Sequence, residues 1–250
     1  MRRLWWFRTG WPRVAFLAAL SPQAAIPPAP APAAAGYLPA QEVIWSDMAQ
    51  RRFLRDHCHA AYPAEVHYDI GMYLFEEDNY ELSLEHYLRA IEISPTFTEA
   101  YFGIGLLYYT LGDDLNAKRF YRRALECDPE DADVRNNLGL IHYRQGDLLR
   151  AEAEITEALR LDPGSPDAHY NLGLVYYRGN DLQSAAAQFL HAVREDPAYT
   201  RARFNLGVVY YELGLDALAT SAWSIVIRDE PEGALATKAR ENLATMRGTE

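Results

Sequence analysis

A glycine returns every 34 residues through most of the chain, and this spacing limits the possible folds more than any other feature. When the chain is divided into five rows of 34 residues from Ala64, the eighth position of every row is glycine: Gly71, Gly105, Gly139, Gly173 and Gly207. The rows run over 64–97, 98–131, 132–165, 166–199 and 200–233 without an insertion. A fixed period of about 20–50 residues indicates stacked structural units that each contact only their neighbours.

Three further positions of the row explain the period. Position 20 is always small, which lets two helices approach closely: Ser83, Ala117, Ala151, Ala185 and Ala219. Position 15 holds only residues that tolerate a positive φ, so it is predicted to turn the chain between the helices: Asp78, Gly112, Gly146, Asn180 and Gly214. Position 32 is always proline, which cannot extend the second helix: Pro95, Pro129, Pro163, Pro197 and Pro231.

This pattern resembles the tetratricopeptide repeat, and the resemblance covers 170 of the 250 residues. It implies an all-α fold, a right-handed α-solenoid of five 34-residue helix-turn-helix repeats with a C-terminal capping helix. The five repeats are expected at the five rows, and the capping helix at 234–250. The apolar stripe of that helix would be Leu235, Ala239, Leu243 and Met246.

The residues before the repeats indicate a leader, a linker and one more helix. Four arginines and no acidic residue stand in the first thirteen positions, before the short apolar run VAFLAAL at 14–20. Residues 1–25 are therefore expected to be a signal peptide or N-terminal anchor, cleaved or retained. Residues 26–40 are rich in proline and alanine and predict an extended linker. Residues 41–63 have helical periodicity and are expected to pack on the first repeat.

The leader predicts an exported or membrane-associated protein, on the periplasmic side if bacterial, with a cytoplasmic protein as the alternative. The formal net charge is −11, and all the acidic residues follow the arginine-containing start. A strongly acidic body repels phosphate backbones, so no nucleic-acid partner is expected.

No catalytic chemistry is predicted. The sequence has no phosphate loop, no nucleophile elbow and no paired catalytic carboxylates, so neither an enzyme nor a cofactor is expected. Consecutive helical residues point in different directions, so His57, Cys58 and His59 are not expected to bind a metal. Cys127 is expected to be a small packed apolar group.

The first helix of each row has two distinct sides. At about 100° per residue, positions 4, 7, 8 and 11 cluster on the side expected to pack within the helical pair. Positions 2, 5, 6, 9, 12 and 13 lie opposite, on the side that lines the concave groove in the tetratricopeptide family. Position 6 is asparagine in the last three rows, position 9 is aliphatic or methionine, and position 12 is always aromatic.

These residues form the predicted peptide-binding set. An asparagine side chain offers both a donor and an acceptor, so amides one repeat apart could hold a peptide backbone while aromatic rings contact its side chains. The arrangement resembles the asparagine ladder of protein O-GlcNAc transferases. The set is Asn137, Asn171, Asn205, Tyr109, Tyr143, Tyr177, Tyr211, Tyr170 and Phe204. The competing interpretation is that these residue types serve only to pack the repeats.

The sequence therefore predicts a non-catalytic adaptor that binds an extended peptide or helical segment of a partner. The carboxylate clamp of chaperone-binding repeats is not expected, because positions 5 and 9 lack its lysines and arginines. Two alternatives stay open: a scaffold that self-assembles through its repeats, and a substrate-positioning subunit of a separate enzyme. A homo-oligomer and a membrane tether through the N-terminus are left open as well.

Overall fold

The computed structural model describes residues 63–248, and the regular structure of this part of the chain is entirely α-helical. Its helices are α5 (Ala64–Glu76), α6 (Tyr80–Ile93), α7 (Thr98–Thr110), α8 (Asp114–Cys127), α9 (Ala132–Arg144), α10 (Leu148–Leu161), α11 (Pro166–Arg178), α12 (Leu182–Glu195), α13 (Thr200–Glu212), α14 (Asp216–Asp229) and α15 (Ala234–Gly248). The expected leader, linker and N-terminal helix, up to residue 62, lie outside the described residues, and so do His57, Cys58 and His59.

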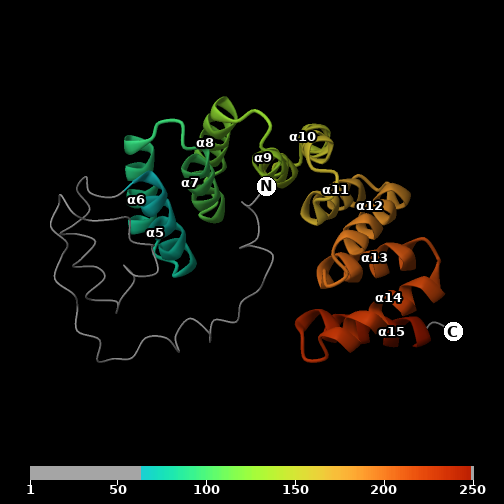
Figure 1. The fold of residues 1–250 in the computed structure, drawn as a ribbon. Helices are drawn as coiled ribbons and strands as arrows, with labels where there is room; N and C mark the ends of the chain where they lie inside the picture. The colour runs from blue at the N-terminus through green and yellow to red at the C-terminus, as the bar shows by residue number, and fades with distance from the viewer. Residues whose placement is uncertain (1–62, 249–250) are drawn as a thin grey trace, which may run out of the picture.

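The helices form hairpins that stack along an arc (Figure 1). In each hairpin a first helix packs on a second, as α5 does on α6 and α7 on α8, and every second helix also contacts the first helix of the next pair. α7 contacts both α5 and α9, and α9 contacts α11, so these first helices lie side by side along the inner side of the arc. The expectation of an all-α solenoid of helical repeats is confirmed.

The turn within each pair has the predicted backbone geometry. The residue at position 15 has a positive φ in all five pairs: 58° at Asp78, 80° at Gly112, 81° at Gly146, 61° at Asn180 and 73° at Gly214. Aspartate then caps the second helix in three pairs, where the side chains of Asp113, Asp147 and Asp181 accept a hydrogen bond from a backbone N–H of the first turn. These local contacts end one helix and begin the next within three residues.

The end of each second helix also follows the prediction. The last residue before the proline has a non-helical backbone, with ψ between 67° and 97° at Ser94, Asp128, Asp162, Asp196 and Glu230. A following proline disfavours the helical conformation at that residue, so the helix stops there.

The regular spacing of glycine has a direct steric cause. A Cβ atom on Gly105 would lie 2.4 Å from the Tyr121 ring, and one on Gly173 would lie 2.6 Å from the Phe189 ring. The residues facing position 8 belong to position 24 of the same row, and all are buried: Tyr87, Tyr121, Ile155, Phe189 and Trp223. Position 20 is also fully buried in every pair. The close approach of the two helices therefore requires glycine against a large side chain.

The buried stripe of the first helices differs from the one expected. Position 3 is 0–1% exposed in every pair, at Val66, Ala100, Val134, Ala168 and Ala202, and position 7 is also buried throughout. Positions 4 and 11 are instead half-buried in most pairs. From α7 onward, each first helix is flanked by its own second helix and by that of the preceding pair, so its buried stripe is wider than one helix contact predicts and is shifted toward position 3.

Tyr121 is a large buried residue that carries an unsatisfied polar atom. Tyr121 is 0% exposed, and its hydroxyl oxygen has no hydrogen-bond partner among the described residues. A buried polar group without a partner costs about 1–3 kcal/mol. We expect Tyr121→Phe to leave the free energy of unfolding unchanged or to raise it by about 1 kcal/mol in urea denaturation. Tyr87→Phe is the control, because it removes a hydroxyl from the equivalent position of the first pair. A marked loss of stability in Tyr121→Phe alone would contradict the claim that the Tyr121 hydroxyl has no hydrogen-bond partner.

The C-terminal helix closes the stack as predicted. Leu235, Leu243 and Met246 pack beside the buried Ala239 against Trp223 of α14. By contrast, Cys127 is exposed and not packed, because it is the last residue of α8 and lies beyond the helix contact. Within residues 63–248, none of the helices has the length and apolarity needed to cross a membrane.

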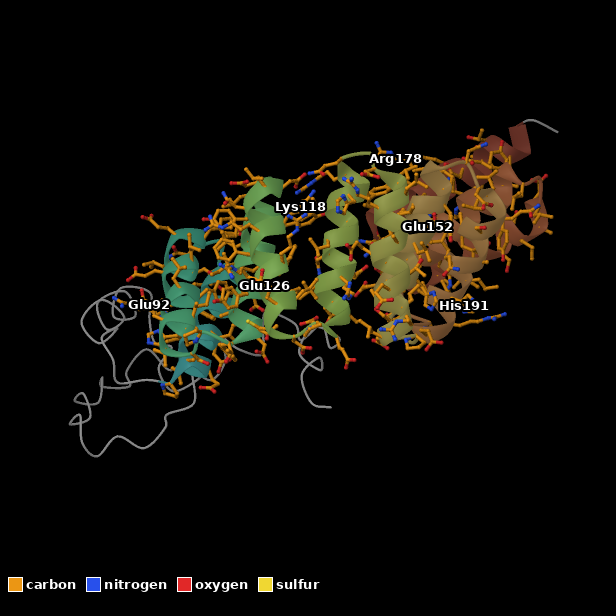
Figure 2. The ribbon with its side chains drawn as sticks, turned by 90° about the horizontal axis from the view of Figure 1, so that it is seen from above. Glu92, Lys118, Glu126, Glu152, Arg178 and His191 are labelled. Carbon is orange, nitrogen blue, oxygen red and sulfur yellow. The ribbon has the colours of Figure 1, made fainter. Side chains whose placement is uncertain are left out.

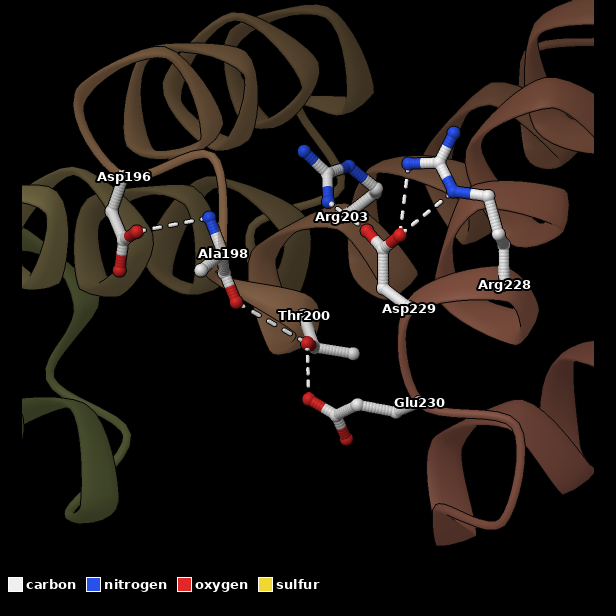
Figure 3. A network of polar contacts seen from close by, with 7 residues as sticks. All are labelled: Asp196, Ala198, Thr200, Arg203, Arg228, Asp229 and Glu230. Atoms are coloured by element: carbon white, nitrogen blue, oxygen red, sulfur yellow. Dashed lines mark hydrogen bonds and ion pairs between the residues drawn. The ribbon is translucent and has the colours of Figure 1, made fainter. Parts of the chain in front are cut away.

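A polar network joins the loop before α13 and the start of α13 to the end of α14, within the last pair (Figure 3). The Thr200 hydroxyl at the start of α13 donates to the Glu230 carboxylate after α14, at 2.5 Å. Asp229 accepts from Arg203 of α13 at 3.3 Å and from Arg228 at 2.8 Å. These contacts tie the start of α13 to the end of its own second helix.

Candidate functional site

The candidate site is the inner face, which we define as positions 2, 5, 6, 9, 12 and 13 of α5, α7, α9, α11 and α13. The curvature of the stack brings these five helices together on one side (Figure 1). Each pair repeats the same helix with the same face turned inward, because the turn and the glycine contact are the same in each pair. Side chains from different pairs therefore form rows along the stack.

An apolar row runs along the centre of the inner face. Position 9 is half-buried in every pair: Met72, Leu106, Leu140, Leu174 and Val208. Position 12 is half-buried at Phe75, Tyr109, Tyr143 and Tyr177, and Tyr211 is 40% exposed. Partial exposure across all five pairs leaves a continuous strip of aromatic and aliphatic surface that the described part of the chain does not cover.

Three of the four position 12 tyrosines are held by the next pair. The Arg144 guanidinium lies 4.1 Å from the centre of the Tyr109 ring, pairs with Asp114, and donates to the Tyr109 carbonyl at 3.2 Å. Arg178 repeats the contact 5.1 Å from the Tyr143 ring. In the next pair the Tyr177 hydroxyl donates to Glu212 at 2.6 Å. Position 13 of one pair thus orients position 12 of the preceding pair.

The three predicted asparagines make different contacts. The Asn171 side chain donates to the Asn136 side-chain oxygen at 3.0 Å, and the Asn205 side chain donates to the Tyr170 hydroxyl at 3.2 Å. The residue at position 5 of the pair before Asn137 is Phe102, whose side chain has no polar group. Asn137 instead donates to the Asp133 carbonyl in its own helix at 2.8 Å. Asn171 is only 7% exposed, so it lies deeper than a side chain open to the groove.

The position 5 aromatic residues pack against rings from α12, α14 and the loop before α13. The Tyr170 ring lies 5.1 Å from that of Tyr199 and 5.7 Å from that of Phe189. Phe204 lies 6.4 Å from Trp223. These contacts hold the rings in place while leaving both side chains half-exposed.

An acidic row runs along the edge of the inner face. Position 2 is Glu65, Glu99, Asp133 and Asp167 in the first four pairs. Burial raises the pKa of Asp133 from 3.8 to about 6, and the neighbouring Asp131, Asp162 and Asp167 add to the increase. Burial also raises the pKa of Asp69 at position 6, with Glu65 as the second cause. Negative charge is therefore crowded at this edge.

The raised pKa of Asp133 gives a prediction with a definite sign. Because the folded-state pKa lies above 3.8, the folded protein holds the proton more tightly, and stability falls as pH rises from about 4 to 6. We expect Asp133→Asn to be more stable than wild type at pH 7, with the difference disappearing toward pH 4, in thermal melts. Asp181→Asn is the control with the opposite sign, since hydrogen bonds from Ser184 lower the pKa of Asp181.

Two buried histidines, His67 and His86, contact each other. The Nδ1 atoms of His67 and His86 lie 3.1 Å apart, and both side chains are at most 2% exposed. Burial lowers the pKa of both, that of His86 to about 4, so both are neutral at neutral pH and one ring donates to the other. Over residues 63–248 no group of three or more histidine, cysteine, aspartate or glutamate side chains is placed to hold a metal.

Five hydrogen bonds between the first helices of successive pairs follow one register. The bonds from Arg144 to Tyr109, Asn171 to Asn136, Asn205 to Tyr170, Arg178 to Tyr143 and Tyr177 to Glu212 all join residues 35 apart. Each joins one position to the next-numbered position in the following row. Comparing position 5 with position 6, and 12 with 13, would have found these pairs in the sequence.

A stack of helical hairpins in which the described residues leave the inner face exposed defines a class of fold, the α-solenoids. A family model described as tetratricopeptide repeat matches residues 102–166, 136–200 and 170–224, and a second, described as TPR repeat, matches 71–112. The chain therefore belongs to the tetratricopeptide repeat family. Proteins of this family generally mediate protein–protein interactions, and their fold is typically non-catalytic.

Solved structures show the same fold at low sequence identity. The pilF protein of Pseudomonas aeruginosa is 21% identical with a TM-score of 0.67, over 74% of this chain and 84% of that one. YrrB, described as a TPR protein with an unusual peptide-binding site, is 22% identical with a TM-score of 0.54, over 76% and 97%. A MamA fragment of Desulfovibrio magneticus RS-1 is 18% identical with a TM-score of 0.58, over 68% and 97%. No curated protein sequence matches the chain.

Proposed function

We propose that this protein is a non-catalytic adaptor that binds an extended segment of a protein partner along its inner face. The observation that carries the proposal is the continuous strip of half-exposed side chains at positions 9 and 12 across five pairs. An aromatic side chain presents a large contact area at a small cost in conformational entropy, and aromatic residues are enriched in protein interfaces. The neighbour described as having a peptide-binding site has the same fold and supports this direction.

The proposal keeps the predicted set of asparagine, tyrosine and phenylalanine residues but gives the three asparagines different roles. The amide donors of Asn171 and Asn205 bind position 5 of the preceding pair, so these residues shape the face as well as line it. Asn137 makes no contact between pairs through its amide donor, and we assign it the most direct contact with a bound backbone.

Site-specific photo-crosslinking in the full-length chain tests the proposal. A crosslinking residue at Leu174 of the inner face should capture a partner segment, whereas the same residue at Glu126 of α8 should not. The captured segment is then synthesised and titrated against wild type and Leu174→Glu. Saturable binding that Leu174→Glu abolishes supports the proposal, and equal binding by both proteins excludes the inner face.

A scaffold that self-assembles is the second candidate. Leu115 and Leu149, in the first turns of α8 and α10, are 80% and 81% exposed, and exposed apolar side chains in adjacent pairs favour association. Sedimentation velocity would decide: a concentration-dependent oligomer that Leu115→Glu with Leu149→Glu dissolves would establish self-assembly at this edge.

A further inference from the structure

We infer that the segment bound along the inner face is cationic, with lysine or arginine side chains on the acidic row and apolar side chains on the strip beside it. The inference rests on the proposed function and names the chemistry of its partner. Its basis is the geometry of two parallel rows: carboxylates at position 2 of α5, α7, α9 and α11, and rings or aliphatic chains at positions 9 and 12 of the same helices. An extended basic segment with alternating apolar residues matches both.

Two of the three arginines of the inner face lie away from the acidic row, and the third, Arg201, takes position 2 of α13 and ends the row. Arg144 is paired with Asp114 and stacked on Tyr109, and Arg178 is stacked on Tyr143 and bonded to its carbonyl. Both lie at position 13, at the other end of the helix from position 2. They are engaged at the far edge of the face, whereas Asp133 and Asp167 lie at the opposite ends of α9 and α11.

A bound cation would relieve the crowding of carboxylates around Asp133. Burial is the largest cause of the raised pKa of Asp133. The other causes are three carboxylates, on Asp131, Asp162 and Asp167. The Asp131 side chain accepts from the Val134 N–H, and Asp167 accepts from the Tyr199 hydroxyl. A guanidinium or ammonium group placed among them would offset their mutual repulsion, and opposite charges across an interface also increase the association rate.

The aromatic row offers further positions for cations. Tyr109 and Tyr143 each have an arginine of the next pair over the ring, at 4.1 and 5.1 Å. Among the described residues, Tyr177 and Tyr211 have no such arginine, because position 13 of the following pair is Glu212 and the stack then ends in α15. Arginine side chains of a bound segment could occupy these two rings in the same way.

Two labelled peptides test the inference with the full-length protein. The first is a twelve-residue peptide that alternates arginine with leucine or alanine, and the second has every arginine replaced by glutamate. We expect the arginine peptide to bind, with a dissociation constant that rises steeply with salt, and the glutamate peptide to bind at least about a hundred-fold more weakly.

Matched variants locate the interaction. Asp133→Asn with Asp167→Asn should weaken the arginine peptide by about ten-fold or more. Glu92→Gln with Glu126→Gln is the control, since it removes the same charge from α6 and α8, both second helices (Figure 2). The control should stay within about two-fold of wild type. Calorimetry at pH 6 in two buffers of different ionisation enthalpy should show proton release on binding, which Asp133→Asn removes.

The outcomes separate this inference from the proposed function. If both peptides bind equally and Leu174→Glu weakens both, the inner face binds peptides but the inference is wrong. If the two double variants weaken binding equally, the attraction belongs to the overall charge and the inference is wrong. If neither peptide binds, a cationic ligand is excluded, while the crosslinking experiment still decides the proposed function. The inference is established if only the arginine peptide binds and only Asp133→Asn with Asp167→Asn weakens that binding.

Discussion

Replacing Gly173 by leucine should destabilise the fourth helical pair more than any other single change considered. A Cβ atom alone would lie 2.6 Å from Phe189 Cε1 and 2.7 Å from Cδ1, on a ring that is 0% exposed. The longer side chain must force α11 and α12 apart, and overpacking of this kind costs about 1–3 kcal/mol or more. Because each pair depends on its neighbours, the thermal transition should also broaden or split.

A nearby glycine provides the control. Gly179 ends α11 with φ −77°, and a Cβ atom there would have no neighbour closer than 3.4 Å. Gly179→Ala should therefore leave the melting temperature almost unchanged, while Gly173→Ala already lowers it and Gly173→Leu lowers it further. A melting curve for Gly173→Leu that overlays wild type would contradict the steric role of position 8.

Changing Asn137, Asn171 and Asn205 together to alanine should weaken partner binding by about ten- to a thousand-fold. Each lost hydrogen bond is worth about 0.5–1.5 kcal/mol, and three such losses give this range. The affinity is measured by titrating the crosslinked partner segment against wild type and variant. Affinities that agree within error would remove these amides from the binding mechanism.

The single variants separate binding from packing. Asn137→Ala removes an amide whose donor serves only its own helix, so the melting temperature should hold while the affinity falls. Asn171→Ala removes the bond to the buried Asn136, so it should lower both the stability and the affinity. If Asn137→Ala leaves the affinity unchanged and Asn171→Ala lowers only stability, the asparagines are packing residues.

Most of the fold can be predicted from the sequence, because its determinants act within one hairpin. The positive φ at Asp78 and Asn180, the helix ends before proline and the glycine facing a large side chain are local requirements that repeat every 34 residues. Each can be met only by a few residue types, so those types appear at fixed positions. The stripe of α15 is predictable for the same reason, since one period of helix describes it.

The side-chain contacts of the inner face depend on how neighbouring pairs pack, and no single 34-residue row contains that information. Whether an asparagine at position 6 binds Asn136, Tyr170 or its own backbone depends on the residue at position 5 of the preceding pair. Burial of position 3 and exposure of Cys127 likewise depend on the helix that the stack places beside them. The raised pKa of Asp133 needs its burial in the stack and, after that, carboxylates from α11 and the neighbouring loops close to it. The sequence by itself determined the hairpin and its period, whereas the tertiary structure decided which side chains of successive hairpins touch, because that contact joins residues 35 apart.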